Sequence, residues 1–180
     1  MTERAWAHVV DRTWLGDPDH RRRLDRRVRG WLGQRRGLSG SALESVAAYT
    51  VERAHSEILR LGEHSLWLPC STSLALAGEL ILGAKSASIL SNAVDEWNQR
   101  IDEQAWIDVH AINNLRNVFC HPACPPVDEL TRHIRREGEE RELAALIDRD
   151  WTALGTRRVA EYSLRKLDAV GRHAMHRWGI

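Results

Sequence analysis

Apolar residues recur at intervals of three and four positions along almost the whole chain, and this spacing constrains the fold more than any other feature of the sequence. Residues 43–61 illustrate it, since Leu43, Ala47 and Val51 would lie on one side of a helix. The same spacing returns in residues 106–119 and through most of the last third of the chain. No useful length of alternating apolar and polar residues, which is typical of strands, is present. The sequence therefore predicts an all-α fold, a bundle of about six to eight helices.

Capping residues place the first helix boundaries. The apolar spacing of residues 6–14 predicts a helix that ends at Gly16. Asp17 and Pro18 follow directly, and Asp is a favoured N-cap while Pro suits the first helical position. A second helix is therefore expected to begin at Pro18.

The middle of the chain predicts two further helices. Residues 41–61 form the first, and Gly62 is expected to end it. A loop around Pro69 then precedes a long apolar helix over residues 72–91. Small residues in that helix, Gly78 among them, would let a neighbouring helix approach closely. Such a helix belongs in the interior of a bundle.

Length and composition favour a single unit. The 180 residues are enough for one domain with its own core. The breaker-rich stretch 34–40 predicts a boundary between an arginine-rich helical segment, residues 1–38, and a helical domain, residues 39–180, within one compact unit. The three cysteines argue against a disulfide scaffold, and no apolar leader follows Met1, so we expect a cytoplasmic location. No stretch reaches the ~20 apolar residues that a membrane span needs.

Arginine is concentrated between His20 and Arg36, where eight arginines accompany Asp25 as the only acidic residue. This local formal charge of +7, in a chain of net charge +1, suggests a polyanionic partner. We expect four of these arginines to bind RNA phosphates: Arg22, Arg23, Arg26 and Arg27. A merely solvated arginine face and an acidic protein partner stay open. Trp14 and Trp31 could stack on bases, but the core is the favoured place for both.

A polar stripe lies opposite the apolar side of the predicted helix that Pro122 ends. Its members recur every three or four residues: His110, Asn113, Asn117 and His121. Asn is a mediocre helix former, so a face that is only solvated has little reason to repeat it. Arg116 lies at the edge of the stripe. We expect this face to be a functional site.

The sequence Arg116-Asn117-Val-Phe-Cys-His121 resembles the motif of the HEPN superfamily, small helical proteins many of which are ribonucleases. Their hallmark is Arg, four to six residues, then His, commonly with a polar residue such as Asn directly after the Arg. The resemblance covers about a helix and a half around the motif. It implies a metal-independent endoribonuclease with an RNA substrate, acting as a homodimer in which two motifs face each other. It also implies a role as a toxin or antiviral effector, with an antitoxin or other regulatory protein as partner.

The residue types suit RNA cleavage without a metal or other cofactor. A guanidinium is always charged and can contact two phosphoryl oxygens, which fits Arg116 for stabilising the negative charge that builds on phosphate. An imidazole exchanges protons near neutral pH, which fits His121 for proton transfer. Asn117 would orient the phosphate or the imidazole, and Asn113 would contact the RNA.

Two alternatives stay open. A zinc site could combine Cys120, His121 and Cys124 with His110 or His133. The Cys-x3-Cys spacing departs from the usual zinc motifs, so we expect no metal. The motif residues could also simply cap a helix C-terminus, where cations are favoured. In that case the protein would be a non-catalytic helical module that binds nucleic acid or protein.

Overall fold

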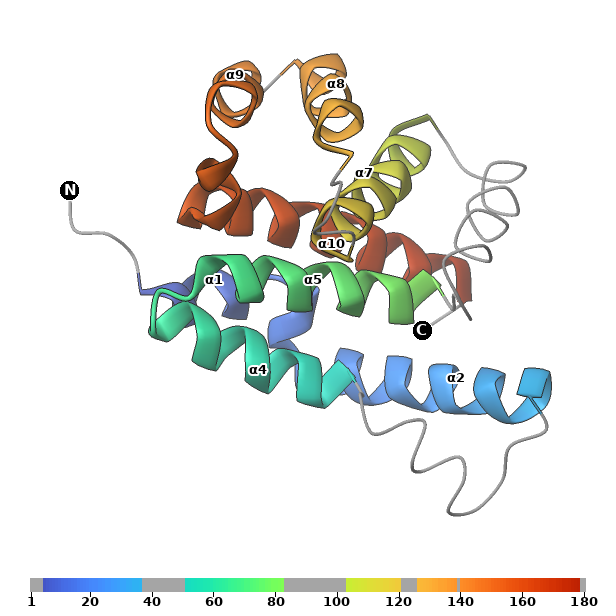
Figure 1. Ribbon diagram of the computed structural model, residues 1–180. Helices are drawn as coiled ribbons and strands as arrows, with labels where there is room; N and C mark the ends of the chain where they lie inside the picture. The colour runs from blue at the N-terminus through green and yellow to red at the C-terminus, as the bar shows by residue number, and fades with distance from the viewer. Residues whose placement is uncertain (1–4, 37–50, 83–102, 121–125, 139, 179–180) are drawn as a thin grey trace.

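The computed structural model describes the chain in five stretches, and every regular element in them is helical (Figure 1). The described residues are 5–36, 51–82, 103–120, 126–138 and 140–178. They form eight α-helices and two short 3-10 helices, and these residues contain no strand. The prediction of an all-α bundle is confirmed. None of the described helices is long and apolar enough to cross a lipid bilayer.

The described elements divide evenly between the two halves of the chain. The N-terminal half contains α1 (Trp6–Asp11), η1 (Trp14–Gly16), α2 (Pro18–Arg36), α4 (Val51–Glu63) and α5 (Trp67–Leu82). The C-terminal half contains α7 (Glu103–Cys120), α8 (Val127–Glu137), α9 (Arg141–Arg149), η2 (Trp151–Gly155) and α10 (Arg157–Trp178).

Helix α5 lies at the centre of the bundle and packs against α4, α7 and α10 (Figure 1). Its residues Leu74, Ala77 and Ile81 are fully buried, as a helix with apolar residues on several sides requires. Helices α8 and α9 pack against each other at the top of the view in Figure 1, and α7 lies beside α8. Helix α2 lies at the bottom of the same view, on the other side of α5.

The start of α2 follows the prediction from its capping residues. The carboxylate of Asp17 accepts a hydrogen bond from the backbone N–H of Asp19 at 2.8 Å, and Pro18 is the first residue of the helix. The preceding helix differs from its prediction, because it ends at Asp11 and a 3-10 turn follows. Tertiary contact explains the break: the indole N–H of Trp14 donates to the Leu167 carbonyl of α10 at 2.9 Å. Trp14 therefore lies in the core, as expected, whereas the Trp31 side chain lies outside the described residues.

Two boundaries around α4 and α5 were predicted wrongly. Helix α4 runs to Glu63, and Gly62 lies inside it beneath Trp6, where an added Cβ would come within 2.1 Å of the indole ring. Gly62 thus permits a close approach and does not end the helix. Pro69 lies in the first turn of α5 instead of in a loop, because the N–H that proline lacks has no helical partner at that position.

The contact between α5 and α7 depends on Gly78. An added Cβ at this position would lie 2.5 Å from Cγ2 of Ile112, so only glycine lets α7 approach α5 this closely. The prediction that Gly78 admits a neighbouring helix is confirmed, while residues 83–91 of the expected helix lie outside the described residues. The close approach places α7, which carries Arg116 and Asn117 of the candidate motif, directly on the core.

Candidate functional site

Helix α7 presents one buried and one partly accessible face. Val109, Ile112 and Leu115 are fully buried against α5 and α10. Asn113 and Asn117 are half-buried on the other side, as their spacing from the apolar residues predicts. The polar face is therefore held in place by the packing of the opposite face.

Two residues of the motif are joined by a hydrogen bond. Nη1 of Arg116 donates to Oδ1 of Asn117 at 3.1 Å, and both side chains are half-buried near the end of α7. This bond limits the directions in which the guanidinium can point. The third residue of the motif, His121, lies outside the described residues.

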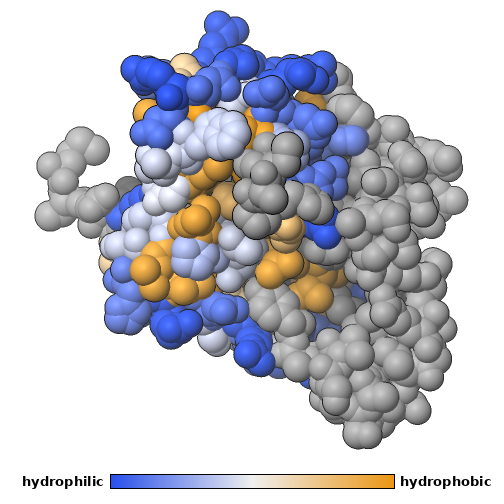
Figure 2. Space-filling model, viewed as in Figure 1, coloured by the Kyte–Doolittle hydropathy of each residue, from blue (hydrophilic) through white to orange (hydrophobic). Residues whose placement is uncertain are grey.

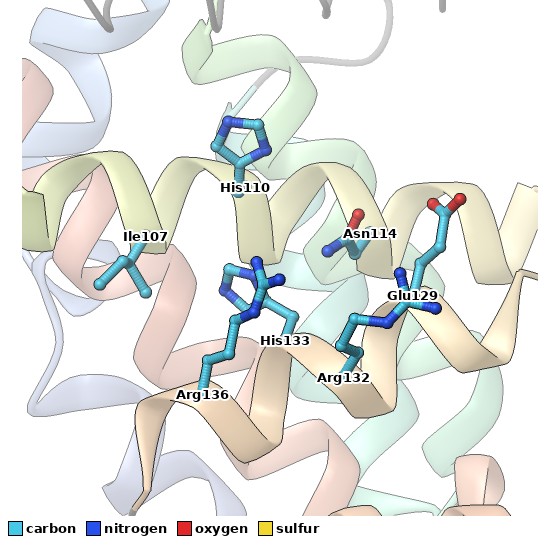
Figure 3. A pocket seen from close by; sticks show the side chains of 7 residues that line it. All are labelled: Ile107, His110, Asn114, Glu129, Arg132, His133 and Arg136. Atoms are coloured by element: carbon cyan, nitrogen blue, oxygen red, sulfur yellow. The ribbon is translucent and has the colours of Figure 1, made fainter.

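A pocket of about 520 Å³ lies between α7 and α8 (Figure 3). It is lined by Ile107, His110, Asn114, Glu129, Arg132, His133 and Arg136. The side chains of the two arginines and of His133 extend from α8 toward α7 (Figure 3). Figure 2 shows hydrophilic side chains over the top of the molecule, where α8 and α9 lie. The pocket thus opens beside a strongly polar surface.

The charge of the pocket favours an anion. Arg132 and Arg136 are exposed, and neither forms an ion pair with a carboxylate among the described residues. Among the described residues of the lining Glu129 is the only acidic one, so their formal charge stays positive even when both histidines are neutral. Two guanidinium groups at the mouth of a hollow attract and orient negatively charged ligands.

A buried ionic cluster behind the pocket ties three helices together. Nζ of Lys166, on α10, lies 2.8 Å from Oδ1 of Asp108 on α7 and 3.0 Å from Oε1 of Glu137 on α8. The hydroxyl of Tyr162 donates to the same Glu137 oxygen at 3.2 Å. Nε2 of His133 also lies 3.2 Å from this oxygen. The cluster therefore holds the His133 ring, which forms part of the pocket wall.

The carboxyl group of Glu137 is ionised at neutral pH. Burial opposes its ionisation most strongly, but the hydrogen bond from His133 and the charge of Lys166 outweigh that effect and lower its pKa below the ordinary value. Burial and the neighbouring Glu137 raise the pKa of Tyr162, which keeps the phenol protonated as a donor. A fixed carboxylate 3.2 Å from Nε2 of His133 helps to set the orientation of the imidazole ring.

The arginines predicted to bind RNA are located elsewhere. Four of them are exposed on α2: Arg22, Arg23, Arg26 and Arg27. Arg22 pairs with Asp19 one turn earlier. Arg21 of the same cluster is buried and pairs with Glu52 at 2.9 Å, so it has a structural role. Since α5 lies between α2 and α7, these four arginines are not brought together with Asn113 (Figure 1).

Metal ligands do not cluster in the described part of the chain. No group of three or more His, Cys, Asp and Glu side chains is arranged there to hold a metal ion. Cys120 is a half-buried free thiol at the end of α7. The other two residues of the alternative zinc site, His121 and Cys124, lie outside the described residues.

The α8 side of the pocket was not predicted from the sequence. The sequence does contain a pattern that indicates a polar face on α8. The residues of this face follow helical spacing opposite the apolar stripe: Glu129, Arg132, His133 and Arg136. Asn114 on α7 also lines the pocket, but of the asparagines on this helix only Asn113 and Asn117 were predicted as site residues. The spacing alone could reveal a polar face on each helix, but not that the two faces meet.

No family model, no curated protein and no solved structure matches this chain. Function must therefore be inferred from the residues of the chain itself.

Proposed function

We propose that the protein is a metal-independent endoribonuclease whose catalytic residues are Arg116, Asn117 and His121. The observation that carries this proposal is the hydrogen bond between Arg116 and Asn117, 3.1 Å long, between two half-buried side chains of α7. The cationic pocket between α7 and α8 supports an anionic substrate such as RNA. The likeness of the motif to that of the HEPN superfamily supports the reaction type.

The reaction needs one proton acceptor, one proton donor and one fixed cation. The 2′-oxygen of a ribose forms a bond to the adjacent phosphorus while the bond from phosphorus to the 5′-oxygen breaks. His121 takes the proton of the 2′-hydroxyl or returns one to the departing 5′-oxygen, and Arg116 stabilises the negative charge on the phosphoryl oxygens. Asn117 holds the guanidinium and orients the phosphate. The products carry a 2′,3′-cyclic phosphate and a 5′-hydroxyl.

The biological role follows from the resemblance. Two motifs facing each other across a homodimer would supply both the proton acceptor and the proton donor. Uncontrolled RNA cleavage harms a cell, so the proposal includes a toxin or antiviral effector in the cytoplasm, restrained by an antitoxin or other regulatory protein.

Arg116→Ala and His121→Ala should each lower the rate of cleavage of a single-stranded RNA, measured in EDTA, by about 100- to 1000-fold. Asn117→Ala should cost less, about tenfold, because an orienting amide carries no charge. Arg149→Ala is the matched control, since this arginine is exposed on α9, and its rate should equal that of the wild type. The chemical ends of the products identify the nucleophile.

Two results would contradict this assignment. Cleavage that stops in EDTA would show that a metal ion takes part. Activity that survives both alanine substitutions would show that Arg116 and His121 do not take part in the reaction. Circular dichroism melting of each variant separates a loss of chemistry from a loss of folding.

A second candidate function is a non-catalytic module that binds nucleic acid. The exposed arginines on α2 favour it, because they form a cationic surface remote from the motif (Figure 1). Electrostatic binding to phosphates needs no catalytic groups and depends steeply on salt.

Replacing Arg22, Arg23, Arg26 and Arg27 together by alanine should flatten the dependence of RNA affinity on salt. Each phosphate contact on a single strand contributes about 0.7 to the slope of log affinity against log salt, so the slope should fall by up to about 3. The matched control replaces four exposed arginines from other helices and connections: Arg12, Arg60, Arg141 and Arg149. Equal slopes in the two variants would show that α2 does not bind RNA.

A further inference from the structure

We propose that the pocket between α7 and α8 binds one nucleotide of an RNA strand, with its phosphate on Arg132 and Arg136 and its base beside His110. This inference rests on the proposed function, because the strand is the one that would be cleaved next to Arg116. It assigns a substrate site to residues of α8 that lie outside the motif.

The two arginines form a suitable phosphate site. They lie four residues apart on α8, so their side chains extend from the same face of the helix toward α7 (Figure 3). Like charges at this spacing repel each other, and an anion between them removes the repulsion. Glu129 lies nearer to Arg132 than to Arg136 in the same view, and it forms no ion pair with either arginine. Guanidinium forks contact two phosphate oxygens at once, which makes arginine the best residue for this role.

The size of the pocket exceeds what a phosphate alone requires. Its volume of about 520 Å³ falls within the range typical of small-molecule sites, about 300 to 1000 Å³. Ile107 provides an apolar wall and His110 an aromatic ring, and unpaired RNA bases stack on such rings. The amide of Asn114 can both donate to and accept from the edge of a base. The lining therefore matches a nucleotide better than it matches a free inorganic anion.

Buried ionic contacts hold the two helices of the pocket together. Lys166 connects Asp108 on α7 with Glu137 on α8 through two contacts of 2.8 and 3.0 Å. Glu137 in turn holds His133 in the pocket wall. Because the two helices are joined by a buried cluster, the two walls of the pocket need not be brought together at the moment of binding.

The pocket also lies in line with Asn117 of the motif. Ile107, His110 and Asn114 follow one another at intervals of three and four residues, and Asn117 continues this row toward the end of α7. The helical rise places Asn117 about 4.5 Å along the axis beyond Asn114. A strand that lies along this row would occupy the pocket with the nucleotide adjacent to the phosphate that Asn117 orients.

Binding can be measured separately from cleavage with a fluorescent 2′-O-methyl oligoribonucleotide, which lacks the attacking hydroxyl. Arg132→Ala combined with Arg136→Ala should raise its dissociation constant about tenfold or more in an anisotropy titration. The matched control, Arg141→Ala with Arg149→Ala, removes the same charge from two exposed arginines of α9 and should change it less than about threefold. Equal effects of the two double variants would overturn the proposal.

A second variant tests the interior of the pocket. Asn114→Asp adds a negative charge at almost the same volume, so it should weaken binding of the same oligonucleotide even if the arginine variant were poorly folded. Adenosine 5′-monophosphate should displace the oligonucleotide from the wild type at a lower concentration than inorganic phosphate does. Equal displacement by the two competitors would reduce the pocket to a general anion site and overturn its assignment to a nucleotide.

The cleavage assay separates this inference from the proposed function. If the wild type cleaves RNA while both double variants bind the 2′-O-methyl strand equally well, the pocket assignment is wrong and the ribonuclease proposal stands. If binding depends on Arg132 and Arg136 while no cleavage is found, the ribonuclease proposal is wrong and the pocket is a nucleotide site in a binding module.

Discussion

Replacing Lys166 by methionine should lower the free energy of unfolding by about 3–5 kcal/mol, because the substitution leaves two buried carboxylates without their cation. The side chains of Asp108 and Glu137 are only 9% and 8% exposed, and the Lys166 ammonium contacts both of them. Methionine has a similar length and is apolar, so it fills the space and removes the charge alone. Urea denaturation followed by circular dichroism measures the loss.

Arg165→Met provides the comparison for Lys166. Arg165 is the preceding residue of α10, is exposed, and pairs with Glu140 at the surface. Such surface pairs contribute about 0–1 kcal/mol, so this variant should stay close to the wild type. A triple variant that adds Asp108→Asn and Glu137→Gln to Lys166→Met should regain part of the stability, because no buried charge is then left unpaired. A loss below about 1 kcal/mol for Lys166→Met would show that water reaches the cluster and screens it.

The substitution Trp14→Ala should also lower the free energy of unfolding by about 3–5 kcal/mol, the usual cost of removing a large aromatic side chain from a core. Trp14 is 1% exposed. Its backbone N–H donates to the Asp168 carboxylate at 2.7 Å, and its indole N–H donates to the Leu167 carbonyl at 2.9 Å. The ring packs directly on Gly171, where an added Cβ would lie 1.9 Å from the indole nitrogen. Any side chain at position 171 would prevent this contact.

Trp151→Ala is the matched control for Trp14→Ala. Trp151 is 56% exposed in η2, so its loss should change the free energy of unfolding by less than about 0.5 kcal/mol. The measurement should use far-ultraviolet circular dichroism, since either substitution alters the tryptophan fluorescence. Similar losses in the two variants would show that the packing of η1 on α10 does not stabilise the fold.

Local features of the sequence were enough to predict much of the fold. The three- and four-residue spacing of apolar residues predicted the helical class, because amphipathicity along one helix involves only near neighbours in the chain. Asp17 caps α2 and Gly138 ends α8 with a φ of 77°, and both roles follow from the preferences of single residues. The polar row on α7 was also readable, because a helix places residues three and four apart on one side.

Contacts between helices could not be predicted in the same way. The first helix stops at Asp11 because Trp14 bonds to Leu167 of α10, more than 150 residues later. Glycine is a common residue at the end of a helix, yet Gly62 lies inside α4, where it makes room for Trp6. In each case a partner remote in sequence outweighs a local preference of modest free energy.

The sequence by itself determined the helical class of this protein, the cap of α2 and the polar row on α7. Only the tertiary structure decided that the polar faces of α7 and α8 meet around a pocket, and that a lysine of α10 joins the two helices behind it. The physical reason is that periodicity specifies which side of a helix is polar, while the neighbour that this side faces depends on how all the apolar sides pack at once.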